Sequence, residues 1–429
     1  MARIEVVTAG VPWYRTVSRE QWRAFFATFL GWVVDAFDYN MLAFVLIDIR
    51  KSFTVDNTLA GALATVTLVM RLAGGVIAGS AADKWGRKLP MMLSILWFSL
   101  FAFLSGFSTS YAMLFGFRAL FGIGMGGEWT SGMPLLLEHW PTRLRGIASG
   151  LLLGGWYWGY LLAAMAFQFI YPIFQGMPDI GWRAMFWLAV IPAFLTLWIR
   201  TGVSESPVWL ARQKKLQQAA REGIKVDEPR FSLVRIFQRD LLATTIHTSA
   251  LIGAFMCSFY SISQWYPTFL REGGRATLPF MVAFNFGAIG GTAFWGRLSE
   301  TKLGRRGAVT ITALVGVASL PLYLHATTVP TLIIGAFLMG AFGCGIWGMA
   351  PAYVTERYPT SARGAGPGFC YHVAAAMGSI MPLLIGNLQD RGMSVANAMT
   401  IPIAASLTTS AILIWLGPET RGRQFTDEP

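Results

Sequence analysis

Five charged side chains lie within otherwise apolar stretches of the first half of the chain, and their types could carry out proton and anion chemistry. They are Asp35, Asp38, Arg71, Arg118 and Glu128. A charge at the middle of a bilayer costs about 2.5–3.5 kcal/mol on insertion scales, so each one needs a partner or a function. A carboxyl can take up and release a proton, whereas an arginine stays protonated and offers a fixed fork of donors to a carboxylate. Together these residues could form a pathway for protons and an anion.

The depths of these residues along their helices indicate which charges face one another. With a helical rise of about 1.5 Å per residue, Asp35 matches Arg71 in depth, and Asp38 matches Arg118. Asp35 and Asp38 are three residues apart and therefore share a helix face. Protonation of Asp38 would free Arg118 to bind an anion, and Asp35 with Arg71 would work similarly or serve as a second relay. Static structural pairs are the alternative.

Glu128 and the second half of the chain differ from this pattern. Glu128 lies about 15 Å further along its helix than Arg118, so it has no basic neighbour at its depth. A protonated carboxyl and a structural hydrogen bonder are equal alternatives for it.

The apolar runs of the second half hold polar and aromatic groups in place of acids and bases. These groups could contact a substrate, although packing is the alternative for each. The predicted proton-coupling residues are Asp35, Asp38 and Glu128, and the predicted substrate-binding residues are Arg71, Arg118, Tyr157, Tyr160, Gln264, Asn285, Tyr371 and His372.

The chain that positions these residues is far more apolar than a soluble protein. Of its 429 residues, 54% are hydrophobic and only 13% are charged, whereas soluble domains carry about 25% charged residues. This composition excludes a soluble enzyme, a disordered chain and a nucleic-acid-binding protein. A helix needs about 20 apolar residues to cross a bilayer, and the sequence predicts an all-α polytopic membrane protein with twelve such runs. The runs are 23–48, 58–82, 89–108, 111–137, 144–172, 181–200, 241–270, 277–298, 307–326, 329–354, 362–388 and 395–417.

Lysine and arginine residues are distributed unevenly around these runs. Of 34 such residues, 26 lie in the two termini and in alternate loops on the same side, six lie on the opposite side, and two lie inside helices. Basic loops stay in the cytoplasm, so both termini are predicted to be cytoplasmic, in a bacterial-type inner membrane. The net charge of +12 then reflects membrane topology and not a nucleic-acid partner.

The longest polar stretch divides the twelve runs into two sets of six. The predicted divisions are a cytoplasmic segment 1–22, a six-helix half 23–200, a cytoplasmic linker 201–240, a six-helix half 241–417 and a cytoplasmic tail 418–429. An internal repeat supports these halves, because residues 79–88 resemble 296–306 and residues 138–146 resemble 356–364, the latter pair offset by 218 positions. Repeats in parallel orientation predict a binding site between the halves near the middle of the membrane.

The loop at residues 79–88 resembles the signature between helices two and three of the major facilitator superfamily. The resemblance extends over residues 20–420 and implies two pseudo-symmetric six-helix halves that work by alternating access. It also implies that loop charges clamp the halves together on the cytoplasmic side and separate during transport. By this resemblance, the gating residues are Asp83, Arg87, Glu138, Arg145, Glu300, Arg305, Glu356 and Arg363.

A closer resemblance lies within the helices. Residues 31–38 resemble the helix-one motif of proton symporters for organic acids. Together with Arg71 and residues 124–128, 155–164 and 343–348, this motif makes the chain most similar to the sialate:proton symporter family, which includes lactate and pyruvate permeases. The resemblance implies proton-coupled import of a small organic carboxylate. Aromatic-acid symporters share the two acids of the helix-one motif and are an alternative. A drug exporter of the same fold is less favoured, because two intramembrane arginines disfavour cationic substrates.

A membrane enzyme is an alternative from a different class. The four histidines are scattered, and the sequence has neither an HExxH zinc motif nor a GxSxG nucleophile motif. We therefore expect no enzyme activity, no metal and no cofactor. The expected partners are a small anionic substrate, protons and the lipid bilayer, with no nucleic acid, and the chain is expected to act as a monomer.

Overall fold

Helix α1 (Arg19–Phe53) illustrates how the sequence sets the ends of the membrane spans. The Ser18 hydroxyl accepts a hydrogen bond from the backbone N–H of Gln21, and the Gln21 side chain accepts one from the backbone N–H of Ser18. This capping box satisfies two donors at the helix start. The helix ends at Phe53, and the next residue, Thr54, adopts a left-handed conformation with φ of 50°. With 35 residues, α1 is longer than the roughly 20 residues that a bilayer requires, so its ends project beyond the hydrocarbon.

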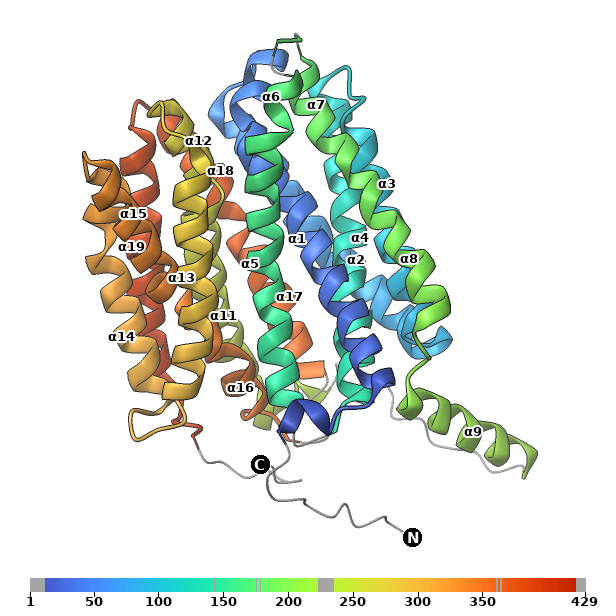
Figure 1. Ribbon diagram of the computed structural model, residues 1–429. Helices are drawn as coiled ribbons and strands as arrows, with labels where there is room; N and C mark the ends of the chain where they lie inside the picture. The colour runs from blue at the N-terminus through green and yellow to red at the C-terminus, as the bar shows by residue number, and fades with distance from the viewer. Residues whose placement is uncertain are drawn as a thin grey trace.

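The computed structural model describes residues 12–141, 144–174, 176–177, 179–222, 235–359, 362 and 365–421. Every regular element in these residues is helical. The first half comprises a short 3-10 helix η1 (Trp13–Arg15), then α1, α2 (Asn57–Trp85), α3 (Lys88–Ser105), α4 (Tyr111–His139), α5 (Arg145–Phe169), α6 (Tyr171–Phe174), α7 (Ile180–Trp187), η3 (Leu188–Val190) and α8 (Ile191–Gly202). Helix α9 (Pro207–Arg221) follows and extends away from the bundle (Figure 1).

The second half contains more interrupted helices than the first. Short 3-10 or π segments, or one or two non-helical residues, interrupt four of its six spans, and such breaks are tolerated at membrane depth where the backbone is buried in protein or lines a cavity. Its elements are α11 (Arg239–Ser263), α12 (Tyr266–Glu272), α13 (Thr277–Leu298), α14 (Gly304–Ala318), η4 (Pro321–His325), α15 (Val329–Leu338), η5 (Met339–Gly343), η6 (Gly345–Gly348), α16 (Ala350–Thr355), α17 (Ala365–Gly378), α18 (Ile380–Asp390) and α19 (Val395–Leu416).

These elements account for all twelve expected spans. Among the described residues, ten helical segments are long and apolar enough to cross a membrane. The other two expected spans are α4, which carries Arg118 and Glu128, and the broken segment formed by α7, η3 and α8. The chain is therefore an all-α, multi-pass membrane protein with the twelve-helix architecture that the sequence predicts.

The two halves lie side by side, as Figure 1 shows. Helix α2 packs against α18 and α17, and α5 packs against α13, which joins the halves along their length. Within the first half, α2 and α4 approach closely at Gly126, where an added Cβ would lie 2.1 Å from the backbone oxygen of Arg71. Only glycine fits there, and this close approach brings the charged residues of α2 and α4 next to α1.

Candidate functional site

Arg71 lies at the centre of the buried charges. Its side chain is fully buried on α2, and its Nη2 atom lies 3.9 Å from Oδ2 of Asp35 on α1. The pair that equal depth predicts is therefore formed. Nε, Nη1 and Nη2 of Arg71 and both carboxylate oxygens of Asp35 nevertheless make no hydrogen bond of normal geometry among the described residues, although the hydroxyls of Tyr260 and Tyr371 lie near the guanidinium. Both groups thus keep hydrogen-bonding capacity that a polar ligand could use.

Four aromatic rings, which we call the aromatic ring cluster, pack next to Arg71. The guanidinium carbon of Arg71 lies 5.3 Å from the ring centroid of Trp32, 5.9 Å from that of Trp156 and 5.7 Å from that of Tyr371. The fourth ring, Trp129, stacks on Tyr371 at 4.8 Å with an interplanar angle of 18°. Trp32 contacts both Trp129 and Trp156, at 4.6 and 5.0 Å. The rings stabilise the cation through their faces, and they come from α1, α4, α5 and α17, so both halves contribute.

Arg118 is placed differently from the prediction. Its guanidinium is fully buried on α4 and forms neither an ion pair nor a hydrogen bond within the described part of the chain. It lies 4.1 Å from the ring centroid of Phe121 and 5.9 Å from that of Phe186, while Asp38 and Asp35 act on it only through longer-range electrostatics. The expected direct pair between Asp38 and Arg118 is therefore not formed, because Arg118 packs against these rings.

Glu128 lies on α4 beside α1, in a space that a glycine provides. It is 1% exposed, and neither of its carboxylate oxygens has a hydrogen-bond partner among the described residues. An added Cβ at Gly31 would lie 2.7 Å from Oε1 of Glu128. Gly31, which begins the helix-one motif, therefore makes room for this carboxyl. A buried carboxyl without partners is a candidate for carrying a proton.

Two predicted residues of the second half, Tyr371 and His372, lie on α17 near Arg71, and the other two, Gln264 and Asn285, come from other segments. Tyr371 belongs to the aromatic ring cluster, and the ring of His372 packs over Gly75, one turn beyond Arg71 on α2, with both ring nitrogens unpartnered in the described chain. Gln264 lies at the break between α11 and α12, and its amide nitrogen and oxygen are likewise buried without partners. The amide of Asn285 donates to the backbone oxygen of Met281 in its own helix, at 2.8 Å.

The two predicted tyrosines of α5 contact the second half. The hydroxyl of Tyr160 donates to the backbone oxygen of Ser263 at 2.6 Å. Tyr157 packs edge-on against Phe259, with ring centroids 6.3 Å apart. The hydroxyl of Tyr160 therefore has a partner within the protein and helps to join the halves.

Sequence reasoning missed the three tryptophans of the aromatic ring cluster. Trp32 lies three residues before Asp35, Trp129 directly follows Glu128, and Trp156 directly precedes Tyr157. Their closeness in sequence to charged or polar candidates was a usable signal. However, an aromatic residue in an apolar run is more often part of the packing, so position alone did not distinguish them.

A second group of charges lies near the end of the bundle that carries α9. Arg87 pairs with Glu138 at 3.3 Å, and Arg305 pairs with Glu300 at 2.6 Å and with Glu356 at 2.8 Å. These predicted gating residues thus join helices within one half, and in the described chain none of these three pairs crosses between the halves. The side chains of Asp83 and Arg145, and all of Arg363, lie outside the described residues.

Two acids that sequence reasoning missed complete these networks in parallel. Glu205 accepts hydrogen bonds from the backbone N–H groups of Arg87 and Lys88, at 2.8 and 3.1 Å. Glu419 accepts from those of Arg305 and Arg306, at 3.1 and 3.0 Å. A carboxylate is favoured at a helix start, where N–H groups have no partner within the helix. The signal was a further repeat, because Glu205 and Ser206 of the first half correspond to Glu419 and Thr420 of the second. The hydroxyl of Ser206 donates to Glu138, and that of Thr420 donates to Glu356.

Replacing Glu419 with glutamine is expected to destabilise the protein in a pH-dependent way. Burial raises the pKa of Glu419, but the N–H groups of Arg306, Arg421, Arg305 and Thr420 outweigh it and hold the pKa below the ordinary value of 4.5. The carboxylate therefore contributes stability above pH 4.5 that is lost as the pH falls through its lower folded-state pKa. The substitution should cost about 1 kcal/mol at neutral pH.

Thermal unfolding of the purified protein in detergent measures this effect. The melting temperature of Glu419→Gln should be lower than that of the wild type at neutral pH, and the two should converge in acid. Glu222→Gln, which alters an exposed acid of the linker, is the matched control. A difference between wild type and Glu419→Gln that persists unchanged in acid would contradict the assignment.

Comparisons with known proteins agree with this architecture. The family profile described as "Sugar (and other) transporter" matches residues 23–238, and that of the "Major Facilitator Superfamily" matches residues 276–427. The chain is 32% identical to a "Probable 4-methylmuconolactone transporter" from Cupriavidus pinatubonensis, over 96% of this chain and 93% of that protein. It is 30% identical to the "Sialic acid transporter NanX" of Escherichia coli, over 87% and 89% of the two chains. A solved "D-xylose-proton symporter" shares the fold with a TM-score of 0.74 at 18% identity, covering 94% of this chain and all (100%) of the other.

Proposed function

Because the chain belongs to the major facilitator superfamily of membrane transporters, we propose that it is a proton-coupled symporter that imports a small organic carboxylate by alternating access. The observation that carries the proposal is the buried Arg71, 3.9 Å from Asp35, whose guanidinium makes no hydrogen bond of normal geometry among the described residues. A planar guanidinium is suited to bind a carboxylate through two parallel hydrogen bonds. The relatives named for methylmuconolactone and sialic acid support an organic acid as the substrate.

In this proposal the pair formed by Asp35 and Arg71 couples the proton to the substrate. The ionised carboxylate of Asp35 neutralises Arg71 in the empty carrier. When Asp35 takes up a proton, Arg71 is released and binds the carboxylate of the substrate in its place. The net charge of Asp35, Arg71 and their ligands is then zero in both the empty and the loaded carrier, so loading adds no unpaired charge within the bilayer. Proton and anion therefore cross together.

We assign the main coupling role to Asp35 and not to Asp38, because Arg118 is held against aromatic rings while Arg71 has an acidic partner. Asp38 lies one turn further along the same helix, and one of its buried carboxylate oxygens has no hydrogen-bond partner within the described residues. Glu128 is the third candidate proton carrier. These two acids extend the proton pathway along α1 and α4 on either side of Asp35.

Orientation and gating complete the proposal. We place both termini in the cytoplasm of a bacterial-type inner membrane, because 26 of 34 basic residues lie on that side. The end of the bundle that carries α9 is then cytoplasmic (Figure 1).

The pairs of Arg87 with Glu138 and of Arg305 with Glu356 hold the cytoplasmic helix ends of each half together as a unit. Each half can then move as a rigid body during alternating access.

An aromatic-acid:proton symporter is the second candidate function. The aromatic ring cluster favours it, because Trp129 and Tyr371 stack at 4.8 Å beside the guanidinium of Arg71. Opened by movement of the halves, these rings would present flat faces to a planar acid whose carboxylate lies on Arg71. The same two intramembrane arginines disfavour export of cationic drugs, the remaining alternative on this fold.

A panel of labelled acids in proteoliposomes with an imposed inward proton gradient tests the proposal. We expect at least one of sialate, lactate, pyruvate and benzoate to accumulate, and its amide or ester not to compete, because only the carboxylate binds Arg71. Preference for benzoate over lactate would favour the aromatic-acid function. Absence of uptake for every acid, or uptake that is unaffected by collapse of the gradient, would overturn the proposal.

A further inference from the structure

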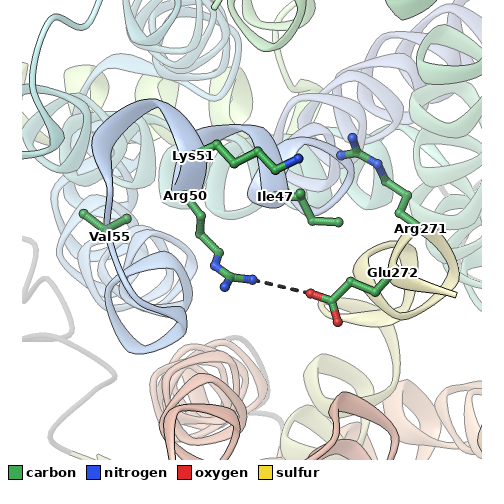
Figure 2. A pocket seen from close by; sticks show the side chains of 6 residues that line it. All are labelled: Ile47, Arg50, Lys51, Val55, Arg271 and Glu272. Atoms are coloured by element: carbon green, nitrogen blue, oxygen red, sulfur yellow. Dashed lines mark hydrogen bonds and ion pairs between the residues drawn. The ribbon is translucent and has the colours of Figure 1, made fainter. Parts of the chain in front are cut away.

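A cavity opens between the two halves at the end of the bundle opposite α9. Its volume is about 500 Å³, and we call it the outer vestibule. It is lined by Ile47, Arg50 and Lys51 from the C-terminal end of α1, by Val55 just after that helix, and by Arg271 and Glu272 from α12 (Figure 2). In the proposed orientation, this cavity faces the outside of the cell.

The outer vestibule concentrates positive charge on the side of the membrane where such charge is rare. Only six lysine and arginine residues lie in the segments on that side, and three of them, Arg50, Lys51 and Arg271, line this one cavity. Positive charge in short outer loops works against the topology that the rest of the sequence specifies. Topology therefore does not account for this cluster.

The three cations of the vestibule are not equally available to a ligand. Arg271 is committed, because it makes two contacts with Asp48, at 2.7 and 3.2 Å, and lies 4.9 Å from the ring centroid of Phe167. Arg50 has a single 3.4 Å contact with Glu272, and its buried Nε atom has no hydrogen-bond partner among the described residues. The pair is loose and partly exposed, so it contributes little stability.

Lys51 is the most available of these cations. Its exposed side chain makes neither a hydrogen bond nor an ion pair within the described chain. Figure 2 shows its ammonium group extending toward the guanidinium of Arg271. The charge of Arg271 is paired with Asp48, whereas Lys51 keeps its charge available for an anion.

We propose that the outer vestibule is a low-affinity capture site for organic carboxylates, in which Lys51 and Arg50 bind the anion and Glu272 competes with it. This inference rests on the proposed function for the identity of the anion. Because Arg50 belongs to α1 and Glu272 to α12, an arriving carboxylate that displaces Glu272 breaks an ion pair between the halves. Capture of the anion would thus favour opening of the outer side toward Arg71.

Chemical labelling of Lys51 tests the site without requiring transport. The purified protein is treated with an amine-reactive reagent, and labelling of each lysine is followed by peptide mass spectrometry. Sodium benzoate and sodium lactate should slow the labelling of Lys51, whereas benzamide and sodium chloride at matched ionic strength should not. Lys302, which is exposed at the opposite end of the bundle, is the internal control and should be labelled equally in all conditions. Equal labelling of Lys51 with and without both carboxylates would overturn the proposal.

Uptake kinetics then test whether the site serves the carrier. In right-side-out vesicles, Lys51→Gln should raise the KM for external substrate roughly three-fold, as expected for loss of one exposed charge contact, while Glu272→Gln should lower it. In inverted vesicles, neither variant should change the KM for substrate offered at the cytoplasmic face. Arg391→Gln, which removes another exposed cation of the outer side, should change neither value.

The two experiments separate the two proposals. Protection of Lys51 in a protein that moves no carboxylate would leave the outer vestibule intact and refute the proposed function. Carboxylate uptake by the wild type, with Lys51 unprotected or with equal KM values for Lys51→Gln and wild type, would refute the vestibule alone. Variants with the expected opposite changes in KM would support both.

Discussion

Replacing Arg71 with lysine is expected to reduce kcat/KM for carboxylate uptake by about 10- to 100-fold, although the positive charge is kept. A hydrogen bond to a charged group contributes about 1.5–3 kcal/mol, and lysine cannot reproduce the two parallel bonds of a guanidinium. Arg71 also lies against the faces of Trp32, Trp156 and Tyr371. A planar guanidinium stacks on such rings, whereas a compact ammonium is more strongly hydrated and does so less well.

Initial rates of uptake in proteoliposomes, normalised to the amount of reconstituted protein, measure this effect. Arg118→Lys is the companion variant, because Arg118 is equally buried but has aromatic rings and no acid as its direct neighbours. We expect it to impair uptake as well. Arg391→Lys, at an exposed position of the outer side, controls for the substitution itself. Full uptake by both buried variants, or competition by the amide equal to that of the acid, would exclude a carboxylate site at these arginines.

The fold could be predicted from the sequence because its determinants are local. Bilayer thickness fixes the length of an apolar run, so the twelve spans follow from the spacing of apolar runs along the sequence. The contact of Asp35 with Arg71 could also be predicted, because the rise per residue is constant and matching depth follows from counting residues. The repeat of residues 138–146 in 356–364 predicts the parallel networks around Arg87 and Arg305, although not that their pairs stay within each half.

The remaining features of the site depend on rotation and packing, which counting residues does not give. Arg118 matches Asp38 in depth, but its side chain turns toward Phe121, 4.1 Å from the ring centroid. The aromatic ring cluster assembles from four helices that are distant in sequence, so no single stretch reveals it. Glu128 fits beside α1 only because Gly31 lacks a side chain. The helix-one motif contains this glycine, but the motif alone does not show which residue packs against it.

The second large effect is expected for Asp35→Asn, which should separate substrate movement from proton movement. Asparagine is uncharged and nearly equal in shape to a protonated aspartate, so Arg71 would remain available to the substrate at all times. Binding of the carboxylate and its exchange across the membrane should therefore be retained. Without a group at this position that gains and loses a proton, a pH gradient could no longer drive accumulation. The wild type should reach about tenfold accumulation per pH unit if one proton accompanies each monocarboxylate.

Counterflow beside gradient-driven uptake, measured for the same reconstituted sample, distinguishes these two activities. Asp35→Asn should show counterflow close to that of the wild type and equal internal and external substrate concentrations under a proton gradient. Asp38→Asn is the matched variant, since it removes the second acid of the same helix face while leaving the contact between Asp35 and Arg71 in place. It should keep partial accumulation if Asp38 only extends the proton pathway. If Asp35→Asn still accumulates substrate and Asp38→Asn does not, the coupling acid is Asp38, and the contact of Asp35 with Arg71 is structural. If both variants accumulate substrate, the role passes to Glu128, whose carboxyl has no partner of its own among the described residues.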